Sequence, residues 1–111
     1  MIQIAPQMRI LLAVEPVDFR KGIDGLAGIC KGLDLDPFCG YLFVFRNKSG
    51  TSLKIITYDG QGYWICQKRL SKGRFHFWPD GGTMTHLAAD ELQALLWNKE
   101  PQKALLWKPL K

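Results

Sequence analysis

The residues of this sequence whose type and spacing most clearly indicate a chemical role are cations, which cluster in the middle of the chain. Between residues 46 and 74, seven basic side chains accompany one acidic residue, Asp59, a local net charge of +6 within a chain of formal net charge +5. Aromatic residues such as Tyr58, Tyr63 and Trp64 lie between them. This pattern is typical of a surface that contacts phosphates, although an ordinary solvated sheet face is the alternative interpretation. The candidate DNA-binding residues are Arg46, Lys48, Lys54, Lys68, Arg69, Lys72 and Arg74, with Arg20 and Lys21 extending the surface.

Carboxylates are the next groups that could do chemistry, because a metal-dependent nuclease needs several of them around its metal ions. Asp18, Asp24 and Asp59 are the candidates near expected ordered elements. Asp18 suits a helix N-cap, Asp24 a helix surface and Asp59 a hairpin turn. We therefore expect no catalytic residue among them.

Histidine and cysteine spacing does not favour a metal site or a nucleophile either. His76 and His86 are ten residues apart, and neither is paired with cysteine at zinc-ligand spacing. The cysteines, Cys30, Cys39 and Cys66, are odd in number and favour reduced, structural thiols. Because phosphate-loop and dinucleotide glycine patterns are also missing, we expect no metal, no cofactor and no small-molecule substrate.

Short apolar runs separated by turn residues predict the strands. The connections between successive runs are short and polar, and the pair Asp59-Gly60 is favoured in hairpins. Successive hairpins predict an antiparallel meander. The strand-like runs are 8–14, 41–46, 53–58, 63–70 and 74–78.

Helical spacing predicts two main helices, one from Phe19 to about Lys31 with Asp18 as N-cap, and one at 90–97. The segment 79–84 reads as a loop. The predicted fold class is therefore α+β, with an antiparallel β-meander of four to five strands and two main helices.

The alternation of side chains assigns faces to the strands. The run 41–46 is apolar on both sides, which predicts a central or covered strand. In the later runs, basic residues alternate with apolar ones, so we expect the basic side chains on one sheet face and at the hairpin ends.

Two features could contact a protein partner. Gly22 and Gly25 stand at i, i+3 in the first predicted helix and would leave a notch, for which tight packing on the sheet is the alternative reason. Residues 98–111 form a tail after a single domain of residues 1–97, and its apolar cluster could dock on the domain or on a partner. That cluster is Leu105, Leu106 and Trp107.

Composition places the chain among globular proteins, at 47% hydrophobic and 23% charged residues. The start of the sequence lacks the features of an export signal, and no apolar run is long enough to cross a bilayer. We expect a soluble, cytoplasmic protein that does not contact membranes.

Five stretches, in order and spacing, resemble the TnpB-type accessory protein, the second small reading frame, of the IS66 class of bacterial insertion sequences. Departures lie near the ends, where the family's Trp-Pro is spread over Phe77-Trp78-Pro79 and the tail after Trp97 differs. The stretches are Asp18 to Leu26 (DFRKGIDGL), Asp36 to Lys48 (DPFCGYLFVFRNK), Leu53 to Ile55 (LKI), Tyr58 to Gly62 (YDGQG) and Lys68 to Phe75 (KRLSKGRF).

The resemblance implies a protein encoded beside a large transposase that supports movement of the element, with no established catalytic residues to carry over. Combined with the charge pattern, it gives two hypotheses. The first is a non-catalytic accessory protein that binds DNA through the basic residues, and the alternative is an adaptor that binds the transposase without contacting DNA. A small nuclease is the third and weakest hypothesis.

Overall fold

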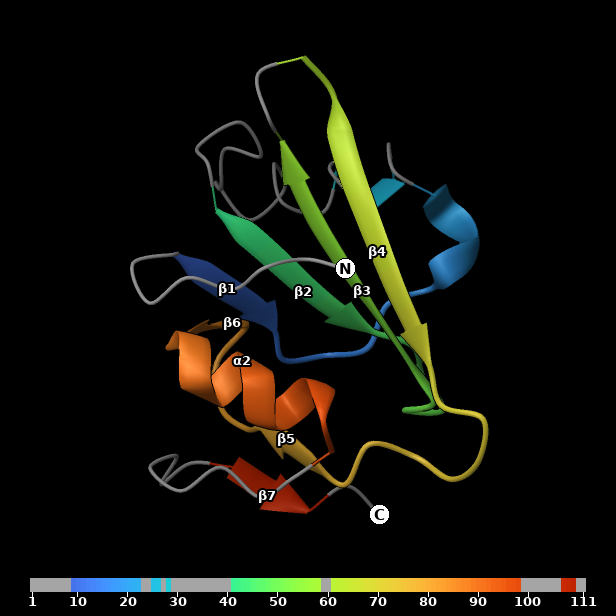
Figure 1. The fold of residues 1–111 in the computed structure, drawn as a ribbon, viewed down its shortest axis with the longest axis vertical. Helices are drawn as coiled ribbons and strands as arrows, with labels where there is room; N and C mark the ends of the chain where they lie inside the picture. The colour runs from blue at the N-terminus through green and yellow to red at the C-terminus, as the bar shows by residue number, and fades with distance from the viewer. Residues whose placement is uncertain are drawn as a thin grey trace.

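The computed structural model describes residues 9–22, 25, 26, 28, 41–58, 61–98 and 107–109. Five strands form one sheet in the spatial order β4-β3-β2-β1-β6 (Figure 1). A separate two-stranded sheet pairs β5 with β7. The strands are β1 (Ile10–Ala13), β2 (Leu42–Arg46), β3 (Ser52–Tyr58), β4 (Tyr63–Arg69), β5 (Phe77–Pro79), β6 (Met84–Leu87) and β7 (Trp107–Pro109).

The predicted meander is confirmed for β2, β3 and β4, which pair antiparallel in sequence order. The β3–β4 hairpin is in register along its whole length, with Tyr58 opposite Tyr63 at one end and Ser52 opposite Arg69 at the other. The rings of Tyr58 and Tyr63 lie edge to face with centroids 5.1 Å apart. Aromatic cross-strand pairs of this kind fix the register of a hairpin.

The prediction of a purely antiparallel sheet is wrong, because β1 pairs parallel with β2 and antiparallel with β6. A parallel pair needs a long crossover connection, and residues 14–41 provide one. The sheet is therefore mixed, within an α+β fold.

The strand predicted at 74–78 is also corrected. The ordered strand in this region, β5, is short and belongs to the second sheet. The fifth strand of the main sheet is β6, which begins at Met84, the last residue of the segment interpreted as a loop. Gly81 and Gly82 have positive φ values of 96° and 74°, a turn conformation that glycine adopts without strain.

One of the two predicted helices is present as expected. α2 (Ala89–Leu96) matches the helix predicted at 90–97, and the Glu91 carboxylate accepts a hydrogen bond from the backbone N–H of Ala88 at 2.9 Å.

The helix predicted from Phe19 to about Lys31 instead starts as the 3-10 turn η1 (Phe19–Lys21), so the described residues give one main helix rather than two. Asp18 caps this turn as predicted, and Gly22 closes it at φ 70°. Left-handed backbone at Gly22 ends the turn. Beyond it, Gly25, Leu26 and Gly28 are helical. Residues 23, 24, 27 and 29–40 lie outside the described part of the chain.

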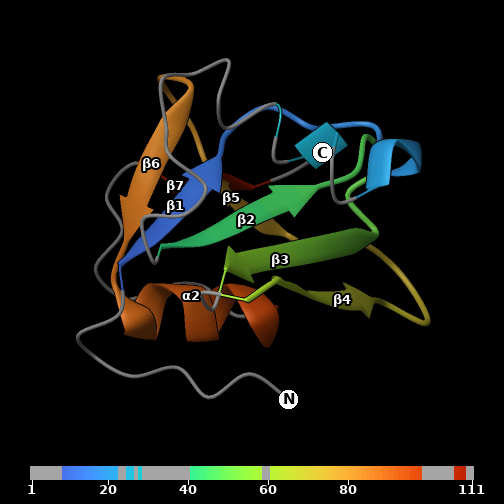
Figure 2. The same ribbon diagram turned by 90° about the horizontal axis from the view of Figure 1, so that it is seen from above.

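Both faces of the sheet are covered, which confirms that the apolar strand at 41–46 is central. Leu42 and Val44 pack on the side of α2 and β5, while Phe43 and Phe45 pack on the side of η1 and Leu26. Figure 2 shows α2 beneath one face of the sheet and η1 beyond the end of β2. The α2 side is also anchored by Trp78, whose indole N–H donates to the backbone oxygen of Val14 at 3.0 Å.

Within the described part of the chain, no helix is long and apolar enough to span a bilayer.

Candidate nucleic-acid interface

A hollow of about 620 Å³ opens on the η1 side of the sheet, and we call it the basic groove. Three separate parts of the chain form it: the η1 turn, the β2–β3 loop and the facing strands β3 and β4. Among the described residues its cations are Arg20, Lys48 and Lys54, and its carboxylate is Asp18. The described lining residues are Val17, Asp18, Phe19, Arg20, Asn47, Lys48, Ser49, Lys54 and Gln67.

Asn47 shapes the loop that forms one wall of the groove. Its side-chain oxygen accepts from the backbone N–H groups of Thr51 and Ser52 at 3.0 and 3.2 Å, and its amide nitrogen donates to the Thr51 hydroxyl. Asparagine commonly stabilises turns by bonding to backbone a few residues on. Because the loop is fixed from within, the side chain of Lys48 is exposed at the rim of the groove.

The opposite wall is held by Asp18 and by a backbone contact to the sheet. The N–H of Val17 donates to the carbonyl of Arg46 at 2.9 Å, which joins the segment before η1 to the end of β2. Asp18 accepts from the backbone N–H of Arg20 at 2.9 Å and from its guanidinium Nη2 at 2.8 Å. The side-chain hydrogen bonds and negative charge of Asp18 raise the pKa of Arg20, so this guanidinium remains charged. The Arg20 side chain is 91% exposed.

Lys54 joins the two walls at the floor of the groove. Its ammonium donates to the backbone oxygen of Phe19 at 3.2 Å and lies 4.8 Å from the centroid of the Phe19 ring. Gln67 is directly opposite Lys54 on β4 and therefore shares its sheet face. Lys54 is half-buried and Gln67 exposed.

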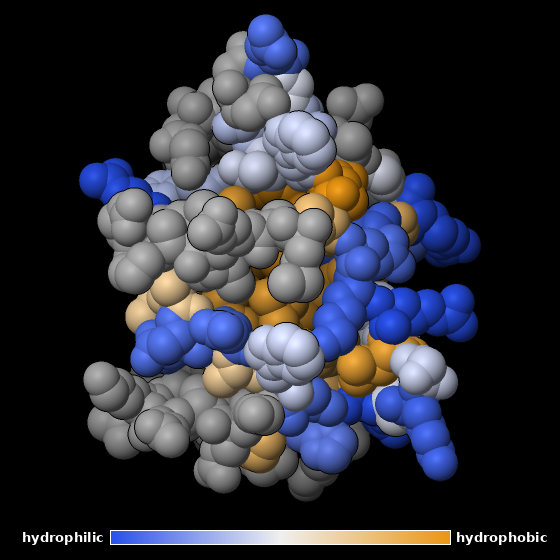
Figure 3. Space-filling model, in the orientation of Figure 1, coloured by the Kyte–Doolittle hydropathy of each residue, from blue (hydrophilic) through white to orange (hydrophobic). Residues whose placement is uncertain are grey.

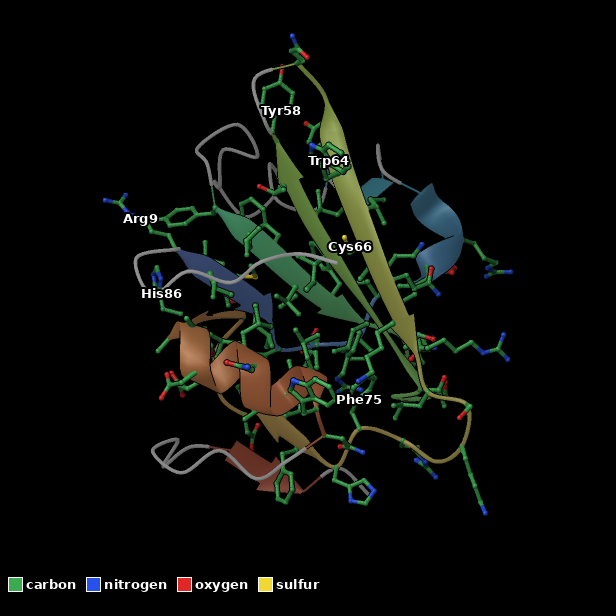
Figure 4. The ribbon with its side chains drawn as sticks, in the orientation of Figure 1. Arg9, Tyr58, Trp64, Cys66, Phe75 and His86 are labelled. Carbon is green, nitrogen blue, oxygen red and sulfur yellow. The ribbon has the colours of Figure 1, made fainter. Side chains whose placement is uncertain are left out.

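Further cations gather at the same end of the sheet. The β4–β5 connection packs on the β2–β3 loop through hydrogen bonds from Leu70 N to Thr51 O and from Phe75 N to Gly50 O, both 2.9 Å. Phe75 is fully buried and anchors this connection below the end of β4 (Figure 4). The exposed side chains of Lys72 and Arg74 are thus brought near the Lys48 loop, and Figure 3 shows hydrophilic side chains along this edge.

The expectation that all basic side chains share one sheet face is wrong for Lys68. It is opposite Leu53, which belongs to the core on the α2 side. Its ammonium donates to the backbone oxygen of Leu96 at the end of α2 and lies 5.4 Å from the Trp97 ring centroid. Cations at a helix C-terminus offset its partial negative charge. Arg69, the next residue, lies on the groove side.

Arg46 is also on the α2 side, opposite Leu53, with its guanidinium 5.4 Å from the centroid of the Trp78 ring. Its Nε is buried and has no hydrogen-bond partner among the described residues, and burial lowers the pKa of Arg46. Arg46 and Lys68 are therefore engaged in packing on the face opposite the groove.

The groove residues that sequence reasoning missed are polar and apolar neighbours of the cations: Val17, Phe19, Asn47, Ser49 and Gln67. The register of the β3–β4 hairpin could have revealed Gln67. Pairing Tyr58 with Tyr63 across the turn places Lys54 opposite Gln67 and Lys68 opposite Leu53.

The residues proposed for protein contact are only partly described. A Cβ added at Gly22 would meet no atom within 4 Å, so its glycine is required by the positive φ and not by close packing. Gly25 is half-buried. Leu105 and Leu106 lie outside the described residues, and Trp107 forms part of β7, whose backbone pairs with β5.

Two tryptophans on the α2 side are exposed; the sequence singled out Trp64 as an aromatic interleaved with the cations, but not Trp97. Trp64 is 59% exposed and Trp97 is 62% exposed. Trp64 and Cys66 follow one another along the same side of β4 (Figure 4), which is the side where Lys68 reaches the end of α2.

Asp18, the described member of the three carboxylates considered for catalysis, is engaged with Arg20, while Asp24 and Asp59 lie outside the described residues. Among the described residues, no three histidine, cysteine, aspartate or glutamate side chains lie close enough to hold a metal ion.

Comparison with known proteins gives one family and two similar proteins. The family model described as "IS66 Orf2 like protein" matches residues 8–104. The uncharacterized protein y4jC of Sinorhizobium fredii is 37% identical over 101 residues, covering 86% of each chain. The uncharacterized protein y4hO of the same organism is 38% identical over 118 aligned positions, covering 100% of this chain and 98% of its own. No solved structure matches the chain.

Proposed function

We propose a DNA-binding role for this chain, which belongs to the IS66 Orf2-like family and is thus an accessory protein associated with an insertion sequence. In this proposal the protein binds DNA through the basic groove and the cations around it, without catalysing a reaction. The observation that carries it is the convergence of Arg20, Lys48 and Lys54, from three separate segments, on one hollow.

The electrostatics of the groove support binding of a polyanion. Three cations line the hollow against one carboxylate, Asp18, which is already paired with Arg20. Arg69, Lys72 and Arg74 extend positive charge along the same end of the sheet. Each phosphate that such a surface neutralises releases condensed counterions, and this release supplies most of the free energy of sequence-independent DNA binding.

We also propose that the protein is not catalytic, and the argument comes from the carboxylate of the groove. The acidic group of the groove caps η1 and pairs with Arg20, a structural use that leaves it poorly suited to hold a catalytic metal ion. Phosphate contacts position a protein on DNA but carry little sequence information, so recognition of the element's ends would need further contacts.

Binding of the purified protein to fluorescent duplex DNA, measured by anisotropy, tests this function. The double variant Arg20→Gln with Lys48→Gln removes two groove cations, and we expect affinity about 60-fold lower at 0.1 M salt if each neutralises one phosphate. The matched control is Arg9→Gln with Lys68→Gln, which removes the same charge away from the groove. Arg9 lies at the opposite side of the sheet from β4 (Figure 4).

Near-wild-type binding by the control together with weak binding by the groove variant supports the groove as the interface. Equal losses would mean that binding follows net charge, and the groove assignment would then be wrong. No binding by the wild-type protein at low salt would reject the DNA-binding function.

A second candidate function is a transposase adaptor, favoured by the exposed rings of Trp64 and Trp97. Tryptophan is enriched among the residues that dominate protein–protein binding energies. Co-purification with the transposase of the same element tests it. Loss of association in Trp97→Ser, with the groove double variant still associating, would support the adaptor; association unaffected by Trp64→Ser and Trp97→Ser would exclude this surface.

A further inference from the structure

The basic groove is an open hollow of about 620 Å³, a volume that can admit a small molecule without enclosing it. A closed duplex presents phosphates and sugars at its surface while its bases remain stacked inside, so it would fill little of this hollow. A nucleotide whose base is unpaired could occupy it.

The lining divides into an exposed cationic rim and a half-buried interior, where the Lys54 ammonium lies 4.8 Å from the centroid of the Phe19 ring. Arg20 and Lys48 are exposed at the rim, whereas Val17 and Phe19 are half-buried. An unpaired nucleotide has the same division, with a charged phosphate at one end and a planar, largely apolar base at the other. The groove therefore offers cations to the phosphate and half-buried apolar side chains to the base.

Arg20 retains donors for a phosphate while it is paired with Asp18. The carboxylate accepts from Nε and Nη2 of the guanidinium. The N–H groups of Nη1 have no partner among the described residues. Since guanidinium carries five donors in a fixed fork, Arg20 can hold Asp18 and a phosphate together.

Gln67 supplies a hydrogen-bonding group for the base. Asn47 uses its side-chain oxygen and one amide N–H within its own loop, and Ser49 bonds to Thr51. The exposed carboxamide of Gln67 has no partner within the described part of the chain, and both a donor and an acceptor are present on it. Carboxamides of this kind bond to two adjacent groups on adenine, and unpaired bases expose all of their edges.

We infer that the basic groove accepts one unpaired nucleotide, so that the protein binds single-stranded or frayed DNA in preference to closed duplex. This inference rests on the proposed function and narrows its substrate. The phosphate contacts Arg20 and Lys48 at the rim, and the base lies against Val17 and Phe19 with its polar edge toward Gln67.

The test uses the full chain and three labelled probes with the same number of phosphates. They are a single-stranded oligo(dA), a single-stranded oligo(dT) and a closed hairpin duplex. We expect both single strands to bind at least about fivefold more tightly than the duplex, the lower end of what one base–aromatic contact contributes. Unlabelled deoxyadenosine monophosphate should displace oligo(dA) at concentrations where inorganic phosphate does not.

Two substitutions separate base contact from phosphate contact. Gln67→Ala, at an exposed position, should reduce the preference for oligo(dA) over oligo(dT) without changing the salt dependence. Phe19→Leu keeps an apolar side chain but removes the ring, and should weaken binding of both single strands by a larger factor than binding of duplex. Thermal unfolding of each variant checks that it is folded.

Equal affinity for duplex and single strands, with no displacement by the mononucleotide, would overturn the inference, and the proposed function would survive if Lys48→Gln still weakened binding. Loss of the Lys48→Gln effect on every probe would instead reject the proposed function itself.

Discussion

The Asp18 carboxylate provides a test in which the expected result is a gain of affinity. Asp18 caps η1 through the backbone N–H of Arg20 and also pairs with the Arg20 guanidinium. Asparagine caps helical turns as well as aspartate does. The substitution Asp18→Asn therefore keeps the cap, removes the negative charge from the groove and releases Arg20.

The size of the effect follows from the charges that line the groove. The three cations and one carboxylate of the described lining sum to a net charge of +2, and Asp18→Asn raises this sum to +3. If the released charge neutralises one more phosphate, the slope of log affinity against log salt becomes steeper by about 0.9. Affinity for duplex DNA then rises about eightfold at 0.1 M salt, and the loss between 50 and 200 mM salt grows by about 3.5-fold.

Anisotropy titrations at four or five salt concentrations measure both quantities. Asp80→Asn is the matched control, because Asp80 is exposed in the β5–β6 connection and its substitution changes the net charge equally. Thermal unfolding of both variants checks that each is folded, so that a gain of affinity can be assigned to the groove. Equal effects of Asp18→Asn and Asp80→Asn, or no change in slope at Asp18, would refute the assignment of the groove as the phosphate-binding site.

Three further predictions concern the α2 side of the sheet. Lys68→Met should lower the free energy of unfolding by about 1 kcal/mol, because the Leu96 carbonyl and the Trp97 ring lose their cation. The same variant should leave the salt dependence of DNA binding unchanged. Thermal melting measures the stability, and anisotropy measures the binding. Arg46→Met removes a buried, unpartnered Nε and should change stability by less than about 1 kcal/mol, whereas a larger loss in denaturant titrations would show that the Trp78 contact is worth more than assumed. Trp78→Phe leaves the Val14 carbonyl without its indole donor, and we expect about 1–3 kcal/mol of destabilisation. The melting temperature of Trp78→Phe should therefore be lower than that of Arg46→Met.

Local signals in the sequence predicted the parts of the fold that form between neighbours in the chain. The β2–β3–β4 meander follows from short polar connections, and α2 follows from its apolar spacing and its acidic first turn. β1 pairs parallel with β2 and antiparallel with β6, and both pairings join segments distant in the sequence. No local turn signal predicts either pairing. β6 has only four residues and follows two glycines, so its propensity alone did not distinguish it from the loop before it.

The candidate site was predicted as a set of charges but not as a surface. The sequence identifies the cations, and their clustering points to phosphates. Their division between the two faces depends on the hairpin register, which places Lys54 and Lys68 on opposite sides. The second wall of the groove depends on the contact from Val17 to Arg46, a tertiary hydrogen bond that no local pattern encodes.

The position of β1 in the sheet has a consequence for how the protein is made. The groove residues that the structure describes all precede residue 68, yet β1 lies between β2 and β6. Translation must therefore reach residue 87 before β1 has both of its neighbours. A product that ends between these points would contain all the groove residues and an unpaired strand edge at β1. Unpaired edges favour association with other chains. A frameshift or early stop after the groove-coding region is therefore expected to yield an aggregating fragment and not a smaller DNA-binding protein.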